Sequence, residues 1–187
     1  MKLVFATGNA GKLKEVNEIL ESAGLQAECV NADLPEIKSE SITETAAAKA
    51  KTAAELFSCP ALADDTGLFF QAYPGFPGAF PKFVFKTLGY NGIFKLLEGR
   101  PRSATFVTAA AYCEPCSSPK VFEGKCKGRI AELPSQESND GLPYDSIFVP
   151  ENEDKAFAQM TLQKKAAYSQ RAKAFRAMAN WIREGKQ

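Results

Sequence analysis

The chain has 187 residues, of which 45% are hydrophobic, and its 23 lysines and arginines outnumber its 22 acidic residues by one, which gives a net charge of +1. This length and hydrophobic content predict a single domain over residues 1–187, and the balanced charge argues against a broad nucleic-acid-binding surface. The absence of histidine excludes a histidine general base, a Ser-His-Asp triad and a histidine-ligated zinc site.

The chain shows no apolar segment of the length that a transmembrane helix requires. The apolar run 3–6 is followed at once by polar residues, and the uncharged segment 66–81 is interrupted by three prolines and three glycines. The five cysteines are an odd number, which suits a reducing compartment better than a disulfide-linked fold. We therefore expect a cytoplasmic protein that binds neither a membrane nor nucleic acid.

Taken in chain order, the hydrophobic periodicity predicts both strands and helices. Strands are expected at 2–6, 26–30, 61–63, 68–72, 103–113, 119–132 and 147–149. Helices are expected from 13 to 24, from 42 to 57 behind a capping box at 41–44, as two short helices around Gly89, from 162, and from 171 to 184. Because two long strands follow one another at 103–132, the α/β fold should contain a mixed sheet rather than a purely parallel one.

A small, polar loop at 7–12 separates the first strand from the first helix. Backbone N–H groups at a helix N-terminus bind anions, and Lys12 adds a positive charge there. The spacing does not match a Walker A loop, because two residues separate Gly8 from Gly11 where that motif has four, and Leu13 replaces its metal-binding Ser or Thr. The segment predicts either a phosphate-binding loop or a turn with a solvated lysine.

Two adjacent acids, Asp64 and Asp65, follow the apolar segment 61–63. Acids at the carboxyl end of a strand usually face a crevice, and a hard divalent cation such as Mg²⁺ would offset their repulsion. The alternative is a simple turn, since Asp-Thr-Gly is also favourable turn chemistry. A metal or catalytic site is favoured, because both acids leave a buried strand.

Several further candidate residues do not indicate a function when each is considered alone. Glu36 in a proline-containing loop and Lys49 on the alanine-rich helix are residue types that are most often solvated. Tyr144, beside Asp145, can stack on a base, although packing in the core is at least as good an alternative. The basic segment 164–171 can donate to a carbonyl or a phosphate, although a solvated helix face is the default. Together with the loop 7–12 and the paired acids, these groups suit a nucleoside phosphate with Mg²⁺.

Cys113 and Cys116 have the spacing of a redox or zinc-binding pair. A redox pair should open a helix, whereas Pro115 and the Ser-Ser-Pro segment 117–119 predict a hairpin turn. Zinc would need a second pair of ligands, and only Cys126 lies near in the sequence. A thiol redox protein is therefore the weakest functional alternative.

The combined pattern resembles the inosine triphosphate pyrophosphatases, the Ham1-like nucleoside-triphosphate pyrophosphatases, over nearly the whole chain. The resemblance rests on T-G-N-x-x-K at 7–12, L-P-E at 34–36, A-D-D-T-G-L at 63–68, P-G-x-P-G at 74–78, Y-D-x-I-F at 144–148, Lys165, and S-x-R at 169–171. It implies an elongated mixed β-sheet flanked by helices, two lobes around a central nucleotide-binding cleft, and a homodimer.

The resemblance also implies a role for each matched residue. Substrate binding would fall to Thr7, Gly8, Asn9, Ala10, Gly11, Lys12, Lys49, Thr66, Lys82, Leu142, Pro143, Tyr144, Asp145, Lys165, Gln170 and Arg171. Mg²⁺ would be held by Glu36, Asp64 and Asp65. Asp65 would also activate water, and together with Lys12 and Lys49 it would form the catalytic set. Tyr144 would be the ring that stacks on the base.

The implied reaction is Mg²⁺-dependent hydrolysis of a nucleoside triphosphate between its α and β phosphates, which yields the monophosphate and pyrophosphate. Lys165 and Arg171, which the resemblance places at the edge of the base, offer only hydrogen-bond donors. The oxygen at position 6 of hypoxanthine or xanthine fits them better than the amino group of adenine. The expected substrates are therefore ITP, dITP and XTP, and the implied role is to remove them from the nucleotide pool.

Two departures from the family pattern lie in the base pocket. Gln170 stands where the family has histidine, and Pro143 and Ser146 flank Tyr-Asp where the family has glycine and proline. Because Gln170 both donates and accepts hydrogen bonds, we expect weaker discrimination against GTP. Two alternatives stay open: a pyrophosphatase for other modified nucleotides, and a nucleotide sensor without hydrolytic activity.

Overall fold

The computed structural model describes residues 3–30, 37, 39–135 and 142–185. Its strands form a seven-stranded mixed sheet with the order β2-β1-β3-β5-β6-β7, in which β4 pairs with β3. The strands are β1 (Val4–Ala6), β2 (Glu28–Val30), β3 (Ala61–Phe70), β4 (Pro77–Gly78), β5 (Ser103–Cys113), β6 (Lys120–Ile130) and β7 (Phe148–Pro150). The predicted α/β fold with a mixed sheet is confirmed.

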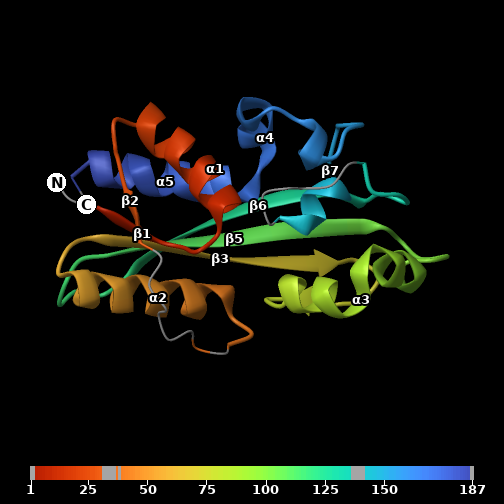
Figure 1. The fold of residues 1–187 in the computed structure, drawn as a ribbon, viewed down its shortest axis with the longest axis horizontal. Coiled ribbons are helices and arrows are strands. Elements are labelled where there is room, and N and C mark those ends of the chain that lie inside the picture. The colour runs from red at the N-terminus through yellow and green to blue at the C-terminus, as the bar shows by residue number, and fades with distance from the viewer. Residues whose placement is uncertain (1–2, 31–36, 38, 136–141, 186–187) are drawn as a thin grey trace.

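The helices cover both faces of this sheet. They are α1 (Ala10–Ser22), α2 (Ile42–Phe57), α3 (Pro81–Leu96), α4 (Leu162–Tyr168) and α5 (Gln170–Arg183), with short 3-10 helices η1 (Pro143–Ser146) and η2 (Phe157–Gln159). Figure 1 shows an elongated molecule in which α1 and α5 lie on one side of the long strands, and α2 and α3 lie on the other.

The local signals that predicted the helices act as expected, with one difference at α2. The Ser41 side chain accepts a hydrogen bond from the backbone N–H of Glu44, which caps α2. The Glu44 carboxylate accepts from the Ser39 hydroxyl at 2.7 Å, so the reciprocal half of the capping box is replaced by a bond to a different residue. Gly89 interrupts α3 at φ 59°, a left-handed conformation that favours glycine, and this confirms the predicted pair of short helices.

The sequence prediction was wrong about the strand that carries the acids. It placed Asp64 and Asp65 at the end of a short strand, whereas β3 runs without interruption from Ala61 to Phe70. The reason is β5, which pairs antiparallel with all ten positions of β3 and holds them in the ladder. The acids therefore lie in the middle of a strand and not in a turn.

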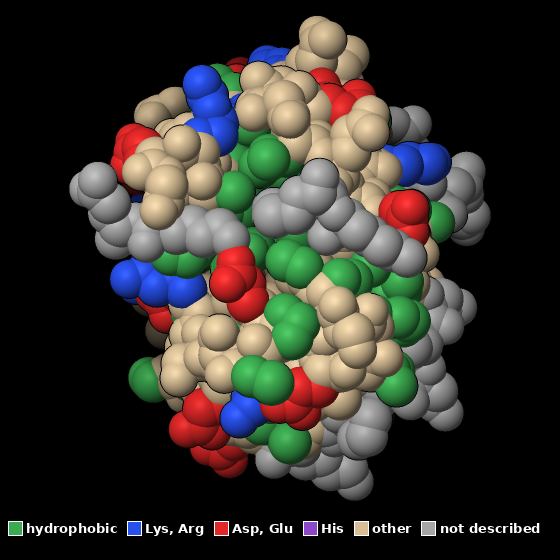
Figure 2. Space-filling model, turned by 90° about the vertical axis from the view of Figure 1, so that its left-hand side faces the viewer, with side chains coloured by type: hydrophobic (Ala, Val, Ile, Leu, Met, Phe, Trp, Pro, Cys, Tyr) green, Lys and Arg blue, Asp and Glu red, His purple; other side chains and the backbone are tan. Residues whose placement is uncertain are grey.

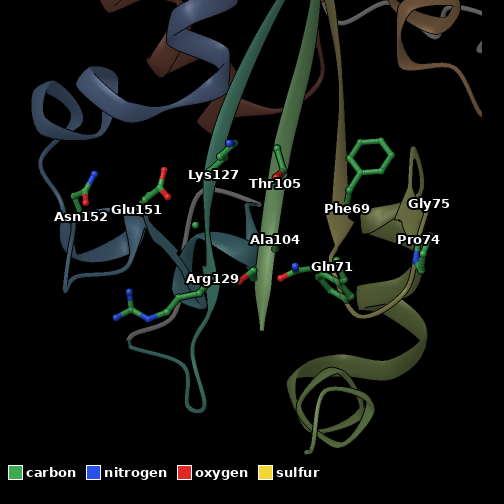
Figure 3. Close-up of a pocket in the computed structure, with 13 residues that line it drawn as sticks. Phe69, Gln71, Pro74, Gly75, Ala104, Thr105, Lys127, Arg129, Glu151 and Asn152 are labelled. Atoms are coloured by element: carbon green, nitrogen blue, oxygen red, sulfur yellow. The ribbon is translucent and has the colours of Figure 1, made fainter. Parts of the chain in front are cut away.

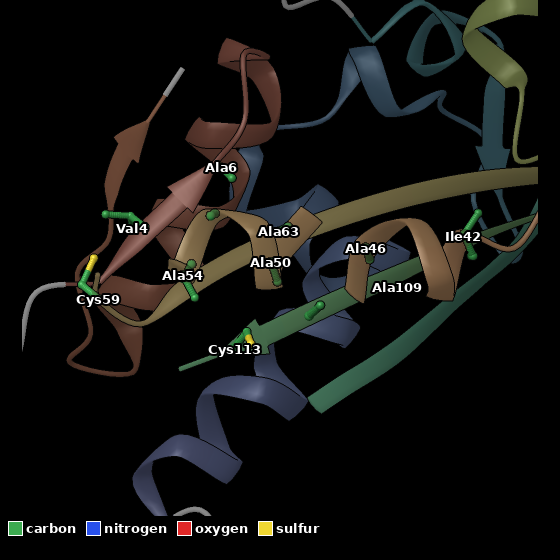
Figure 4. Close-up of a cluster of buried hydrophobic side chains, with 13 residues drawn as sticks. Val4, Ala6, Ile42, Ala46, Ala50, Ala54, Cys59, Ala63, Ala109 and Cys113 are labelled. Atoms are coloured by element: carbon green, nitrogen blue, oxygen red, sulfur yellow. The ribbon is translucent and has the colours of Figure 1, made fainter. Parts of the chain in front are cut away.

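One face of the sheet packs against α2 through small side chains. Ala46, Ala50 and Ala54 of the helix are buried in the same cluster as Ala63 and Ala109 of the strands, as Figure 4 shows. Small side chains allow a helix to approach a sheet closely. Because side chains alternate along a strand, Asp65 shares this face with Ala63.

The opposite face packs against α1 and α5. Phe5 and Phe175 meet edge to face in this second cluster, with ring centroids 5.6 Å apart. The close approach of α5 to β6 requires Gly124, where an added Cβ would lie 2.0 Å from the backbone oxygen of Gln170. Asp64, one residue before Asp65, points to this α1/α5 face.

Charged side chains of both signs are interspersed on the end of the molecule seen in Figure 2, in agreement with the net charge of +1. Among the helices of the described segments, none is long and apolar enough to cross a membrane.

Candidate functional site

One edge of β3 lacks a partner over residues 63–67 among the strands that the structure describes. The parallel neighbour β1 pairs with β3 only as far as Leu62, and β4 begins to pair at Leu68. The loop 7–9 and the N-terminus of α1 follow directly after β1, so they lie beside this gap. The topology thus places the phosphate-binding loop candidate next to Asp64 and Asp65.

The N-terminal loop is held in shape by its own polar side chains. Thr7 Oγ1 accepts from the backbone N–H of Asn9 at 3.2 Å, and Asn9 Oδ1 accepts from that of Lys12 at 3.1 Å, which caps α1. Thr7 and Gly11 are buried, whereas Gly8 and Ala10 are exposed. The loop therefore presents a capped helix N-terminus, and its positive dipole end, at the open edge of β3.

Asp64 is buried and forms ion pairs through both carboxylate oxygens. Lys12 Nζ lies 3.0 Å from Oδ1, and Arg171 Nε lies 3.1 Å from Oδ2. Burial alone would raise the pKa of Asp64, but these two cations outweigh it and the pKa lies below its ordinary value. Asp64 is therefore an ionised residue whose oxygens already have partners.

The ion pairs of Asp64 continue into a buried network of alternating charge. Arg171, 3% exposed, also pairs with Glu15, which is 8% exposed and pairs in turn with Lys165. Lys165 contacts Asp145 as well. Three carboxylates thus alternate with three cations in the order Asp145, Lys165, Glu15, Arg171, Asp64 and Lys12. Each charge in the network has at least one opposite neighbour, which offsets the cost of burying it.

Asp65 has a different environment, although it is the next residue in the chain. Burial and the adjacent Asp64 carboxylate raise the pKa of Asp65 to about 6, against the lowering effects of Lys12, of a hydrogen bond from Thr66 and of Lys49. No ion pair with another described side chain reaches its carboxylate. A carboxylate with this pKa accepts a proton more readily at neutral pH than an ordinary aspartate.

The donor set partly fits a hard divalent cation. Asp65 offers carboxylate oxygens without an ion-pair partner among the described residues, which is the ligand chemistry that Mg²⁺ prefers. Asp64, in contrast, has both oxygens engaged by Lys12 and Arg171. Glu36 lies outside the described residues. Asp65 is thus the ligand among the three predicted acids that the structure supports best.

The residues predicted to hold the base fall into two groups. Asp145, Lys165 and Arg171 meet in the charge network, where Arg171 also donates to Thr66 Oγ1 at 3.4 Å. Tyr144 is 4% exposed and its ring packs edge to face on Phe85 and Phe106. Tyr144 therefore packs in the core, which is the alternative that the sequence analysis gave to stacking on a base.

The remaining predicted contacts are accessible to different degrees. Leu142, Pro143 and Lys49 are partly exposed, and Lys82 is exposed near the start of α3. Gln170 is 5% exposed, and its Oε1 is a buried oxygen without a hydrogen-bond partner in the described structure. A buried acceptor without a partner destabilises the protein unless a ligand or water satisfies it.

Two residues of this region were missed by the sequence analysis. The sequence does contain a signal for Glu15: it is an acidic residue on the buried, otherwise apolar face of α1, one turn after Lys12 and beside Val16. A charged residue at such a position indicates a buried partner of opposite charge. Thr108 is fully buried and its hydroxyl lies 2.7 Å from that of Thr66. It carries no such signal, because pairing between β3 and β5 alone brings the two threonines together.

A separate pocket of about 730 Å³ lies farther along the sheet face that Asp65 occupies. Figure 3 shows Phe69, Thr105 and Lys127 on neighbouring strands, with Glu151 and Gly75 at its two ends. Phe69 is four residues beyond Asp65, which corresponds to about 13 Å along a strand. None of the predicted site residues lines this pocket.

The cysteine pair takes the predicted turn. Cys113 ends β5 and is buried, Cys116 lies in the following turn and is exposed, and all five cysteines are free thiols. The raised pKa of Cys113, caused by its burial, disfavours a reactive thiolate.

Comparisons with known proteins find similar sequences and a similar fold. Residues 3–181 match the model of the Ham1 family. A dITP/XTP pyrophosphatase of Methanopyrus kandleri is 45% identical over 184 residues, which span 98% of this chain and 97% of that protein. Inosine triphosphate pyrophosphatase 2 of Trypanosoma cruzi is 41% identical over 95% of this chain and 90% of its own length. The structure of a HAM1 protein from Coxiella burnetii superimposes with a TM-score of 0.80 at 28% identity, over 98% of this chain and 99% of that one.

Proposed function

Because the chain belongs to the Ham1 family, we propose that it hydrolyses deaminated purine nucleoside triphosphates, such as ITP, dITP and XTP, to the monophosphate and pyrophosphate. Relatives named for dITP, XTP and inosine triphosphate support this substrate class. The observation that carries the proposal is the environment of Asp65: the residue lies in the segment of β3 that is open at one edge, and its carboxylate is under the electrostatic influence of Lys12 and Lys49.

The chain's own residues supply binding, charge and proton transfer. The capped N-terminus of α1, with Lys12 and Lys49, binds the triphosphate and stabilises the charge that develops on the leaving pyrophosphate. Asp65 accepts the proton of the attacking water, a role that its raised pKa favours. Asp64 holds Lys12 in place through their ion pair.

A bound Mg²⁺ would neutralise phosphate oxygens and orient the two reacting groups in line. In this proposal Asp65 is its principal protein ligand and Glu36 the second.

The charge network forms one wall of the base site. Each nitrogen of the Arg171 guanidinium already donates to Asp64, Glu15 or Thr66, so Arg171 supports this wall and has only its remaining N–H groups for a base. Among the described residues of this region, the Gln170 side chain has a buried oxygen with an unmet hydrogen bond. Its Oε1 is an acceptor that suits the 2-amino group of guanine, so we assign the discrimination between hypoxanthine and guanine to Gln170.

Homodimer assembly and a cytoplasmic location are parts of the same proposal. Phe80 and Phe83 expose 44% and 68% of their surfaces on and beside α3, which supports a contact between two copies. Sedimentation velocity measures the state of assembly directly. A purely monomeric boundary at micromolar concentration would contradict the proposed homodimer.

Initial rates of pyrophosphate release test the substrate class and the role of Gln170 together. With Mg²⁺ present, we expect the kcat/KM for ITP and XTP to exceed that for ATP by at least about 100-fold, because the donors of the base site reject an amino group at position 6. Gln170→His should increase the ratio of ITP to GTP hydrolysis.

Three results would contradict these expectations. Equal rates on ATP and ITP contradict the substrate class, and an unchanged ratio in Gln170→His contradicts the assignment of base discrimination to Gln170. Binding of ITP without release of pyrophosphate would identify a nucleotide sensor instead.

A further inference from the structure

Two tyrosines join α3 to η1 by reciprocal hydrogen bonds. The Tyr90 hydroxyl, on α3, donates to the backbone oxygen of Pro143 at 2.8 Å, and the Tyr144 hydroxyl, on η1, donates to the backbone oxygen of Pro81 at 3.0 Å. Each acceptor is the first residue of the other helix. The start of α3 and the start of η1 are therefore fixed to each other at two points.

The rings that carry these hydroxyls are themselves fixed. Phe85 lies between them, with its ring centroid 4.9 Å from that of Tyr90 and 5.9 Å from that of Tyr144. Tyr90 directly follows Gly89, whose left-handed backbone breaks α3 at this point and sets the direction of the segment that carries Tyr90. The contact is thus a built feature of α3 and not a surface side chain that happens to reach η1.

The two joined segments carry different parts of the proposed substrate site. Lys82 follows Pro81 directly, whereas Leu142, Pro143 and Asp145 belong to the base-binding loop. We propose that Tyr90 is a positioning residue, which holds the base-binding loop at a fixed distance from Lys82 so that one nucleotide can contact both. This inference rests on the proposed function, because it assumes that a nucleotide binds between these segments.

Tyr90→Phe removes the hydroxyl and keeps the ring, and the chain offers a matched control. The Tyr73 hydroxyl donates at 2.8 Å to the backbone oxygen of Leu96, at the opposite end of α3 and away from η1. Tyr73→Phe therefore removes the same kind of bond from the same helix. We expect comparable decreases in melting temperature for the two variants.

The kinetic constants for ITP should separate the two variants. We expect the KM of Tyr90→Phe to rise about fivefold, which corresponds to the loss of about 1 kcal/mol of binding free energy, with kcat within about twofold of the parent. Tyr73→Phe should leave KM unchanged. Amide hydrogen exchange gives a second readout. The N–H groups of Asp145 and Ile147, which donate to the backbone oxygens of Leu142 and Tyr144 at the two ends of η1, should exchange faster in Tyr90→Phe only.

An unchanged KM in Tyr90→Phe, or an equal rise in both variants, overturns the positioning role while leaving the proposed function intact. Unchanged exchange of Asp145 and Ile147 in Tyr90→Phe overturns it as well. A parent protein that does not hydrolyse ITP refutes the proposed function first, and the positioning role with it.

Discussion

Asp64 and Asp65 are identical, adjacent residues, but the strand geometry gives their side chains different environments. Alternation along β3 directs Asp64 to the α1/α5 face, where two cations lower its pKa, and Asp65 to the α2 face, where burial raises its pKa. The sequence analysis selects this pair as the centre of a candidate site, and the structure places both acids beside the loop after β1. It cannot assign their separate roles, because it treats Asp64 as a second metal ligand while the fold makes it the partner of Lys12 and Arg171.

The raised pKa of Asp65 predicts a pH dependence of stability in the absence of divalent cations. Between pH 3.8 and about 6 the native state binds a proton at Asp65 that the unfolded chain has released. The free energy of unfolding should therefore fall as the pH rises through this window, by up to about 3 kcal/mol for two pKa units. Asp65→Asn should lack this decrease.

Urea denaturation with EDTA at pH 4 and pH 7 measures the effect. As the pH rises, the free energy of unfolding of Asp65→Asn should increase relative to that of the parent. The same difference at both pH values would contradict the raised pKa that burial gives this carboxylate.

At the scale of elements, local signals predicted most helices and the long hairpin, and tertiary pairing decided the rest. The Ser41 cap begins α2, and the turn at Pro115 joins β5 to β6, as the sequence indicates. The continuity of β3 was not predictable from Asp64–Gly67, because those residues favour a turn in isolation. The ten-residue register with β5, a contact distant in sequence, overrides that preference.

The charge network is the second feature that only the packing of elements creates. Its members come from α1, β3, η1, α4 and α5, so no local pattern groups them. Glu15 is central, because it pairs with both Arg171 and Lys165, and these cations keep its pKa below the ordinary value despite its burial. The network therefore ties α4 and α5 to α1.

Glu15→Gln should destabilise the protein by about 3–5 kcal/mol, because it leaves two buried cations short of one negative partner. The measurement is the free energy of unfolding in urea at pH 7. Glu21→Gln is the matched control, since Glu21 lies on the same helix and is exposed, and it should change stability by less than about 0.5 kcal/mol. Equal effects of the two changes would show that the network contributes nothing specific.

On the scale of the whole molecule, the unequal lengths of the strands beside β3 shape the candidate site. The parallel strand β1 stops beside Leu62 and the antiparallel strand β4 starts at Leu68, so the segment between them is open at one edge while β5 supports the other. The loop after β1, the N-terminus of α1 and the acids of β3 meet there. The family resemblance predicts which residues form the site, whereas the open edge follows from strand lengths that no motif encodes.

The most direct test of this account is the release of pyrophosphate from ITP by the parent and by Asp65→Asn, each with and without Mg²⁺ at neutral pH. We expect the parent to release pyrophosphate only with Mg²⁺, and Asp65→Asn, folded by circular dichroism, to lose at least about 100-fold in kcat. An Asp65→Asn protein that releases pyrophosphate at roughly the parental rate would contradict the central role given to this carboxylate.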